Sequence, residues 1–390
     1  MANIIILGSA YPLRGGGMAT FNERLARELL SEGHQVTIFT FSYQYPSFLF
    51  PGKSQYTDEL PPKDLNIHVK VNSINPLNWL KVGQEIRKLR PDVLIIRYWI
   101  PFMAPCLGSI ARLVKKNNHT RIIAITDNVI PHEKRWFDAI LTKYFINQMH
   151  GFVTMSASVL NDLKSFNVSE HRYSLCLHPI YDNYGEPVPQ IQARETLNIS
   201  KDDSVVLFFG FIRAYKGLDL LIEAFASETL RSLPISLLVA GEFYASPAPY
   251  LKMINELKLN DKIILHNHFI NSDLVKNYFC ASDLVAQPYK EATQSGVSQI
   301  AYHFNIPMVV TRVGGLPEMV PHLKVGYVVD PDPEAIAQAI ADYFTKNQKK
   351  QFQEGIESEK KRFSWSNLTN TILKQAEAST DNHPPTGSDG

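Results

Sequence analysis

Two successive strand-to-helix turns within residues 287–321 constrain the fold more than any other part of the chain. The first is at Ser295-Gly296, where a loop enters a helical pattern of apolar residues. The apolar run 307–310 follows and predicts a short, buried parallel strand. Gly314-Gly315 then allows a tight turn, after which Pro317 suits the first turn of another helix. This succession predicts an open parallel sheet with helices between its strands.

Both turns start a helix at the carboxyl edge of that sheet. Free backbone N–H groups and the positive end of the helix dipole gather there, and both favour a bound phosphate. In open α/β sheets this edge is also where nucleotides bind. We therefore expect nucleotide contacts from the residues at the first turn, which are Glu291, Thr293, Gln294, Ser295, Gly296 and Val297.

The chain begins with a similar alternation of strands and helices. Residues 3–41 read as a βαβ unit of Rossmann type, with Gly15, Gly16 and Gly17 in the loop before its helix. The spacing is not G-x-G-x-x-G, so the loop matches an ordinary dinucleotide fingerprint poorly. The glycines fit either a loop that faces phosphates or a plain flexible connection.

A second series of strands begins at residues 205–209 and ends in Gly210. Arg213 and Lys216 follow, just before an amphipathic helix. Cations in this position make charge-assisted hydrogen bonds to a diphosphate. The alternative for Lys216 is a solvated cation at the start of a helix.

The length of 390 residues is too great for one ordinary domain and suits two of nearly 200 residues each. A hydrophobic content of 45% with 20% charged residues is typical of globular domains. Residues 178–189 are rich in proline and polar residues, which indicates a hinge.

The charge is unevenly distributed, although its total is only +1 and requires no nucleic acid. Residues 1–185 hold 20 Lys/Arg against 14 Asp/Glu, and the remainder holds 19 against 24. The basic first half fits an anionic membrane surface, a phosphate-bearing acceptor or an ordinary solvated surface. We expect a cytoplasmic protein, because the chain has three widely spaced cysteines, a strand-like start and no long apolar run. The cysteines do not have the spacing of metal ligands, so we expect no bound metal.

The motif PMVVTRVGGLPEMV, at residues 307–320, resembles the nucleotide-sugar-binding end of the retaining glycosyltransferases of family four. The Lys216-Gly217 pair matches the end of that family's GRxxxxKG motif. The TQSGV stretch at 293–297 resembles a bacterial branch that lacks the usual E-x7-E pair. The resemblance covers about residues 3–375.

The resemblance implies the GT-B fold, in which two Rossmann-like α/β/α domains with parallel sheets face each other across a deep cleft. We expect an acceptor domain at 1–184, a donor domain at 185–355, a helix at 356–378 that crosses back to the first domain, and a disordered tail at 379–390. The implied activity is retaining transfer of a sugar from a nucleotide-diphosphate donor to a hydroxyl acceptor. The resemblance implies a glycan or lipid-linked acceptor, in the synthesis of cell-surface polysaccharide or glycolipid. The enzyme would then work at the inner face of the membrane.

The same resemblance implies site residues in both domains. Arg213 and Lys216 would take the charge of the leaving diphosphate, without a metal or other cofactor. Asp127 stands where the family's HNxxPHE segment has its first His, and His132 matches the second half of that segment. A solvated first turn of a helix is the alternative for His132. The remaining donor contacts are Gly16, Gly17, Gly210, Gly241, Glu242, Phe269 and Ile270.

Four departures from the family pattern keep two rivals open. Ala292 and Ile300 stand at the two glutamate positions, Asp127 replaces a histidine, and Phe211 occupies the arginine position. These departures favour a non-catalytic protein that binds a nucleotide sugar. A nucleotide-sugar 2-epimerase shares the fold but needs several acid/base carboxylates, and the missing glutamates count against it.

Overall fold

The computed structural model describes residues 1–14, 17–46, 55–58, 60–130, 137–292 and 295–378. The predicted tail at 379–390 lies outside these ranges. The chain divides into two compact units. The N-terminal unit comprises Met1–Leu177 and the segment that returns at Trp365, and the C-terminal unit is His178–Ser364.

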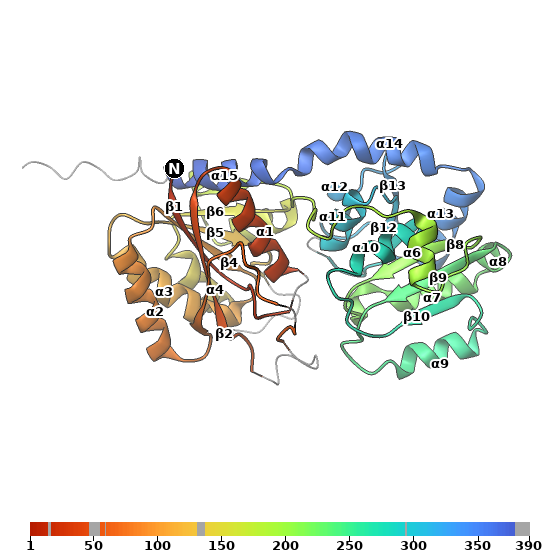
Figure 1. The fold of residues 1–390 in the computed structure, drawn as a ribbon, viewed down its shortest axis with the longest axis horizontal. Helices are drawn as coiled ribbons and strands as arrows, with labels where there is room; N and C mark the ends of the chain where they lie inside the picture. The colour runs from red at the N-terminus through yellow and green to blue at the C-terminus, as the bar shows by residue number, and fades with distance from the viewer. Residues whose placement is uncertain (15–16, 47–54, 59, 131–136, 293–294, 379–390) are drawn as a thin grey trace, which may run out of the picture. The chain divides into compact units, whose positions relative to one another are not determined.

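The N-terminal unit is built on a seven-stranded sheet in which all pairings are parallel (Figure 1). Its strand order is β3-β2-β1-β4-β5-β6-β7. Strand β4 is buried along its whole length, as expected for a parallel strand with both faces covered. The strands are β1 (Asn3–Leu7), β2 (Gln35–Tyr43), β3 (Ile67–Asn72), β4 (Val93–Tyr98), β5 (Arg121–Thr126), β6 (Gly151–Thr154) and β7 (Tyr173–Leu175).

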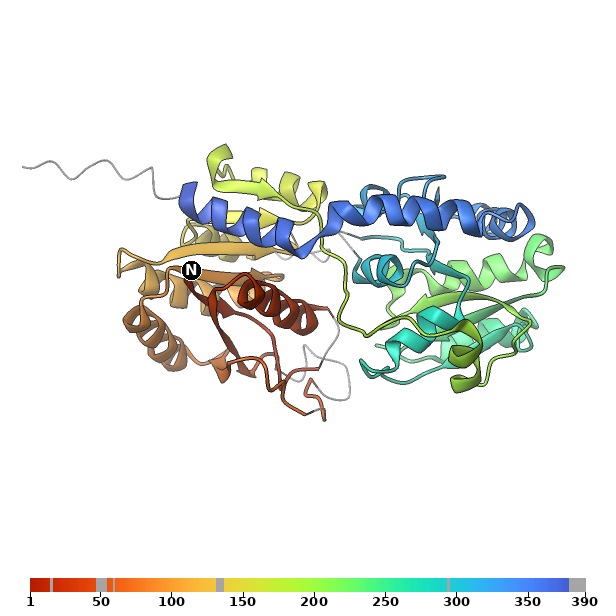
Figure 2. The same cartoon turned by 45° about the horizontal axis from the view of Figure 1, so that its top comes forward.

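Helices α2, α3 and α4 pack beside one another, and α1 packs against α15 (Figures 1 and 2). Helix α2 begins after Asn75, whose side chain accepts hydrogen bonds from the N–H groups of Leu77 and Asn78. The helices of this unit are α1 (Met18–Ser31), α2 (Pro76–Leu89), α3 (Ala104–Lys115), α4 (Asp138–Ile146), α5 (Ala157–Lys164), α15 (Trp365–Ala378) and the short 3-10 turns η2 (Pro101–Met103) and η3 (Glu170–Arg172).

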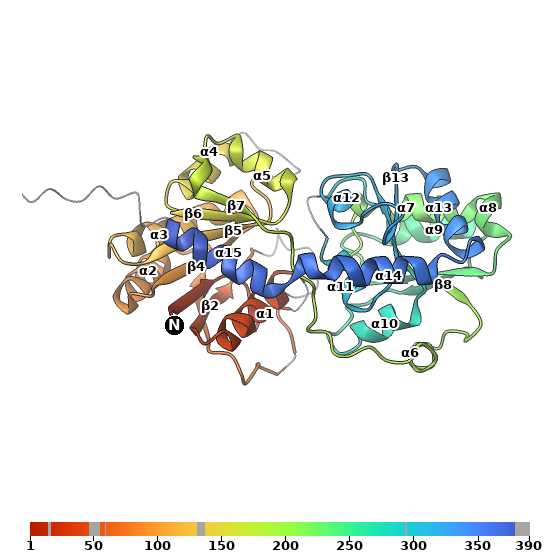
Figure 3. The ribbon, with the colours of Figure 1, turned by 90° about the horizontal axis from the view of Figure 1, so that it is seen from above.

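Helix α15 completes the N-terminal unit although it follows the C-terminal unit in sequence. It contacts β5, β6 and β7, and Figure 3 shows it lying across the sheet. Gln375 accepts a hydrogen bond from Ser174 (2.6 Å) and donates one to the His171 carbonyl (2.9 Å). A Cβ on Gly151 would stand 2.7 Å from Gln375, so glycine permits this close approach. The segment expected to return was 356–378, and the helix that belongs to the N-terminal unit is Trp365–Ala378.

The C-terminal unit has a six-stranded parallel sheet of order β10-β9-β8-β11-β12-β13. The order reverses between β8 and β11, and at such a point the loops that follow the strands diverge and leave room for a ligand. The strands are β8 (Ser204–Phe209), β9 (Ile235–Ala240), β10 (Ile263–His266), β11 (Leu284–Gln287), β12 (Met308–Thr311) and β13 (Gly326–Val329).

Short helices connect the strands of the C-terminal unit, and their apolar faces form its core with the sheet. Asp332 caps the longest of them, α13, by accepting a hydrogen bond from the Ala335 N–H. The helices are α6 (Gln190–Thr196), α7 (Leu218–Ala226), α8 (Glu228–Arg231), α9 (Ala248–Glu256), α10 (Val275–Ala281), α11 (Gly296–His303), α12 (Leu316–Met319), α13 (Pro333–Thr345), α14 (Lys349–Glu359), with the 3-10 turns η4 (Ala214–Lys216) and η5 (Lys360–Phe363).

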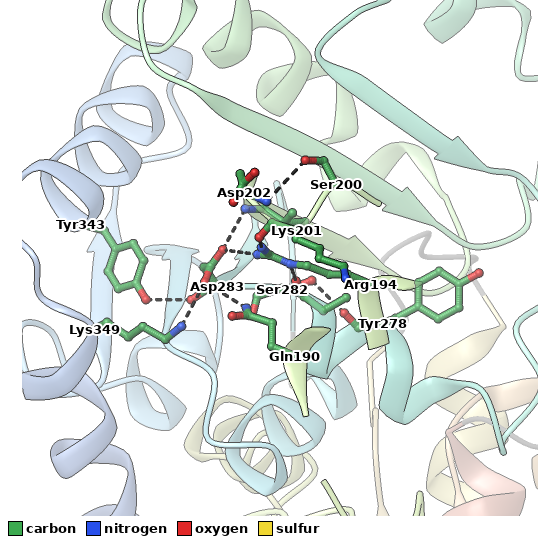
Figure 4. A network of polar contacts seen from close by, with 12 residues as sticks. Gln190, Arg194, Ser200, Lys201, Asp202, Tyr278, Ser282, Asp283, Tyr343 and Lys349 are labelled. Atoms are coloured by element: carbon green, nitrogen blue, oxygen red, sulfur yellow. Dashed lines mark hydrogen bonds and ion pairs between the residues drawn. The ribbon is translucent and has the colours of Figure 1, made fainter. Parts of the chain in front are cut away.

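A polar network around Asp283 ties the amino ends of β8 and β11 to the surrounding helices (Figure 4). The Asp283 carboxylate accepts hydrogen bonds from Arg194 (2.9 Å), Lys349 (3.0 Å) and the Val205 N–H (3.0 Å). Its carbonyl accepts one from the Tyr343 hydroxyl (2.7 Å). The network therefore fixes the sheet from the edge opposite the carboxyl ends.

Candidate functional site

The turn after β8 forms the base of the candidate site. Gly210 has φ +94°, and a Cβ there would lie 3.2 Å from the Lys216 ammonium and 4.0 Å from Val297. Gly217 has φ +67°, and a Cβ there would stand only 1.9 Å from the Pro288 carbonyl oxygen. Both positions need glycine because the chain is left-handed and a neighbour is very close. The turn thus brings the end of η4 against the start of α11.

Lys216 is the buried cation of this turn, with a relative exposure of 9%. Burial, and then the charge of Arg213, lowers the pKa of Lys216 from 10.5 to about 7. Its ammonium lies 5.7 Å from the centre of the Tyr289 ring. Within the described part of the chain, neither a hydrogen bond nor an ion pair reaches this nitrogen. An anion that binds beside this lysine would stabilise its charged form and raise its pKa again.

Arg213 is the second cation, on the exposed side of the same turn. Its guanidinium stacks on Tyr244, with 3.7 Å between Cζ and the ring centre. Tyr244 follows β9, so two neighbouring strands place this pair at the carboxyl edge.

The start of α11 supplies the predicted phosphate-binding turn. Ser295 occupies the N-cap position, and its hydroxyl donates a 2.5 Å hydrogen bond to Gln287 Oε1. A Cβ on Gly296 would lie 2.9 Å from the Tyr181 ring, so the helix starts in tight contact with that residue. The first N–H groups of an α-helix have no intrahelical partner. Thr293 and Gln294 lie outside the described residues, and Glu291 is an exposed residue of the preceding loop.

Gln287 organises this turn from the last position of β11, where it is 1% exposed. In addition to its bond from Ser295, its amide nitrogen donates to the Ser298 hydroxyl (2.9 Å). Nearby, the Thr311 hydroxyl donates to the Tyr289 carbonyl (2.5 Å). Our sequence reasoning missed Gln287, although an amide at the end of an otherwise apolar strand was a usable signal.

The turns after β9 and β10 adjoin the β8 turn. Gly241 has φ +149°, and a Cβ there would lie 2.1 Å from the Gly210 carbonyl oxygen. The Glu242 carbonyl accepts a hydrogen bond from the Ile212 N–H (2.9 Å). Phe269 is half-buried with its ring 6.2 Å from Phe211, and Ile270 is 8% exposed. The predicted residues of β8, β9, β10 and β11 thus gather at one edge of one sheet.

The N-terminal unit holds the other predicted residues. Gly17 precedes α1 with φ +66°, while Gly16 and His132 lie outside the described residues. Asp127 follows β5, and both its carboxylate oxygens accept hydrogen bonds from Arg97 at 2.6 Å. Arg97 is 3% exposed, so Asp127 is held as half of a buried, bidentate ion pair.

No group of three or more His, Cys, Asp or Glu side chains within the described ranges is arranged to hold a metal ion. Among the helices that the structure describes, none has the length and apolar character to cross a membrane.

Comparison with known proteins identifies both halves of the chain. The family model described as Glycosyltransferase Family 4 matches residues 15–180, and the model described as Glycosyl transferases group 1 matches residues 203–346. An uncharacterized glycosyltransferase of Methanocaldococcus jannaschii is 24% identical over 92% of this chain and 93% of its own. The N-acetyl-alpha-D-glucosaminyl L-malate synthase of Bacillus anthracis is 22% identical over 83% and 82%.

Solved structures share the fold. A glycosyltransferase from Rickettsia africae has a TM-score of 0.72 at 20% identity and covers 98% of this chain and 100% of its own. The Anabaena HepE protein in complex with UDP-glucose has a TM-score of 0.74 at 15% identity, with coverage of 96% and 100%. These likenesses confirm the GT-B fold.

The family models and the relatives' names favour a transferase over both the epimerase and the non-catalytic binder. The two models cover most of the chain, one in each unit. The chain therefore belongs to the glycosyltransferases of family four and is a transferase enzyme of the GT-B fold.

Proposed function

We propose that the protein moves a sugar from a nucleotide-diphosphate sugar to a hydroxyl acceptor with retention at the anomeric carbon, and that its C-terminal unit binds the donor. The observation that carries this proposal is the meeting of Lys216, Gly210 and Val297 at the point where the strand order reverses. A buried cation beside the start of a helix suits a diphosphate.

The same groups suit the chemistry of the departing nucleoside diphosphate. Negative charge grows on its terminal phosphate as the bond to the sugar breaks. Lys216, Arg213 and the first N–H groups of α11 would stabilise that charge, and groups fixed before the reaction do so without reorganisation. The proposal assigns this neutralisation to the protein rather than to a metal ion, so donor binding should persist in a chelator.

From the N-terminal unit, we propose Asp127 and His132 as the residues that act on the sugar or the acceptor. The Arg97 pair keeps the Asp127 carboxylate in one orientation. Substituting His132 by Ala should reduce transfer while leaving nucleoside diphosphate binding to the C-terminal unit unchanged.

The test of donor binding is thermal unfolding with UDP, GDP, ADP and their sugar conjugates. UDP comes first because the similar Anabaena protein was solved with UDP-glucose. A ligand at about 100 times its dissociation constant adds roughly 2.7 kcal/mol to the native state. One nucleotide should raise the unfolding temperature, and Lys216→Ala should largely remove the rise.

Lys252→Ala is the matched control because that lysine is on α9 of the same unit with a side chain 74% exposed. It should respond to ligand as the wild type does. If no nucleotide shifts the wild-type transition, the donor assignment is wrong.

For the acceptor side, we propose a peripheral contact with an anionic membrane through α2 and α3, whose helices lie side by side (Figure 1). Leu77 and Leu80 are 77% and 47% exposed on α2. The exposed cations of the two helices are Lys81, Arg87, Lys88 and Arg112, and Lys116 is the residue that caps the end of α3. None of them makes an ion pair within the described residues. Aliphatic and cationic side chains on one surface fit anionic lipid and support a lipid-linked acceptor.

Sedimentation with vesicles tests this contact. Binding should appear with phosphatidylglycerol, be absent with phosphatidylcholine alone, and weaken in salt. The double variant Leu77→Ser with Lys81→Glu should lose it, while Leu251→Ser with Lys252→Glu on α9 should keep it. Equal sedimentation of both variants would overturn the assignment.

A further inference from the structure

Tyr244 and Arg213 form a stacked pair at the carboxyl edge of the C-terminal sheet. The guanidinium carbon lies 3.7 Å from the ring centre, which is close contact between two planar groups. Arg213 belongs to the turn after β8 and Tyr244 to the turn after β9. The contact therefore joins two separate loops of the donor site.

The position of the Tyr244 ring is fixed by its surroundings. Its N–H donates to the Ile212 carbonyl (3.0 Å), and the Ile212 N–H donates to the Glu242 carbonyl (2.9 Å). The ring meets Phe211 edge-on at 6.4 Å, and Phe211 in turn packs on Phe269 at 6.2 Å. Backbone bonds and two further rings thus hold Tyr244 before any ligand arrives.

The charges around the pair are arranged for an anion. Arg213 and Lys216 bracket the short turn η4, and the Lys216 N–H donates a hydrogen bond to the Arg213 carbonyl (2.9 Å). Burial, and then the charge of Arg213, lowers the pKa of Lys216. Among the described residues, no carboxylate pairs with either cation. An exposed arginine would ordinarily turn towards water and away from the lysine. Stacking on Tyr244 opposes that rotation.

We propose that Tyr244 is a positioning residue that holds the Arg213 guanidinium beside Lys216, so that both cations meet the diphosphate of the donor. This inference rests on the proposed function. The Arg213 guanidinium carbon lies over the ring, and among the described residues no hydrogen bond reaches the guanidinium. Its N–H groups can therefore make the paired hydrogen bonds that guanidinium makes to phosphate. Because the side chain is already ordered, less rotamer freedom is lost when the ligand binds.

The experiment compares Tyr244→Leu with Tyr244→Phe by titration calorimetry. The phenylalanine keeps the ring and the leucine does not. The probes are UDP, GDP and ADP, the matching nucleosides, and inorganic pyrophosphate, which reports on the phosphates without a base. Arg213→Ala and the double variant Arg213→Ala with Tyr244→Leu complete the set.

Tyr244→Leu should weaken diphosphate binding roughly three- to five-fold, the range of an exposed cation–π contact. It should leave nucleoside binding unchanged. Tyr244→Phe should bind diphosphate with the affinity of the wild type. Arg213→Ala should weaken diphosphate binding by about ten-fold or more. Adding Tyr244→Leu to Arg213→Ala should then cost nothing further, because the ring acts only through the arginine. In transfer assays, Tyr244→Leu should lower kcat/KM for the donor, because Arg213 meets the diphosphate both in the bound donor and as it departs.

Additive losses, or an equal loss with the nucleoside, would overturn the proposal and make Tyr244 a direct contact of the base. An unaffected diphosphate affinity in Arg213→Ala would also overturn it. If the wild type binds neither pyrophosphate nor any nucleoside diphosphate, the proposed function fails with it. If the wild type binds diphosphate and Tyr244→Leu binds it with equal affinity, the role of Tyr244 is wrong and the proposed function stands.

Discussion

At the scale of single residues, Lys216 has a property that can be measured without knowing the acceptor. Its pKa is about 7 in the folded protein and 10.5 is its ordinary value. Between these values the unfolded state binds more protons, so this group makes stability rise with pH from about 7 to 10.5. A bound diphosphate favours the charged ammonium and raises the pKa again.

We therefore predict that diphosphate binding at pH 8 takes up close to one proton, and that the uptake disappears near pH 6. Calorimetry in two buffers of different ionisation enthalpy measures this number. Lys216→Arg is the control, because a guanidinium stays charged throughout and should bind diphosphate without taking up a proton. Wild-type binding with no proton uptake at pH 8 would contradict the prediction that the diphosphate charges a neutral Lys216.

A second prediction concerns Gln287, which receives a 2.5 Å hydrogen bond from Ser295 and donates to Ser298. Gln287→Leu removes the amide from a buried position and leaves two hydroxyls with one partner fewer. We expect a loss of about 1–3 kcal/mol in unfolding free energy and weaker pyrophosphate binding. Chemical denaturation and titration check both. Thr345→Val, which removes a hydroxyl bond on α13, should affect stability alone.

At the scale of elements, the sequence predicted most strands and helices but few of the contacts between loops. Strands β4 and β12 could be predicted because each contains consecutive apolar residues, at 93–96 and 308–310. Lys216 and Gly296 could be predicted as site residues because each stands at a recognisable strand-to-helix turn. Tyr244 was not predicted, because its role depends on which loops meet in space and the local pattern does not state that. Gln287 was missed although its amide ends an otherwise apolar strand.

The Asp283 network supplies a prediction at this scale. Asp283→Ala leaves the buried Arg194 without its carboxylate and releases α6 and α14 from the amino ends of β8 and β11. Removing one partner of a buried ion pair costs about 3–5 kcal/mol. The unfolding temperature of the C-terminal unit should fall, and nucleoside diphosphate affinity of the folded protein should stay near that of wild type. A stability equal to wild type would mean that the network is not needed.

At the scale of the whole molecule, one ladder of side chains secures the returning helix within the N-terminal unit. Arg24 lies over Trp365 (5.0 Å), Trp365 packs on Phe21 (4.9 Å), and Arg97 lies over Phe21 (3.7 Å). Trp365 is 4% exposed and opens α15. The ladder therefore connects α15, through α1, to the Arg97 that holds Asp127.

We predict that Trp365→Ala lowers the stability of the N-terminal unit by about 3–5 kcal/mol, the usual loss for a buried tryptophan. Scanning calorimetry with a nucleoside diphosphate separates the units, because ligand should raise the transition of the C-terminal unit only. The transition whose temperature does not change with ligand belongs to the N-terminal unit. Trp365→Ala should lower the temperature of that transition. A shift of both transitions by equal amounts would show that the units unfold together.

The order in which the two units can complete their folds follows from the position of α15. The ribosome releases residues 1–177 first, but the helix that covers their sheet emerges only after all of His178–Ser364. The nascent N-terminal unit must wait with part of its apolar surface uncovered, including the face of Phe21 that Trp365 later meets. The C-terminal unit has its whole sequence earlier, and the Ile180 N–H bonds the Phe363 carbonyl (3.0 Å), so its two ends close on each other. The unit made second can thus complete its fold before the unit made first.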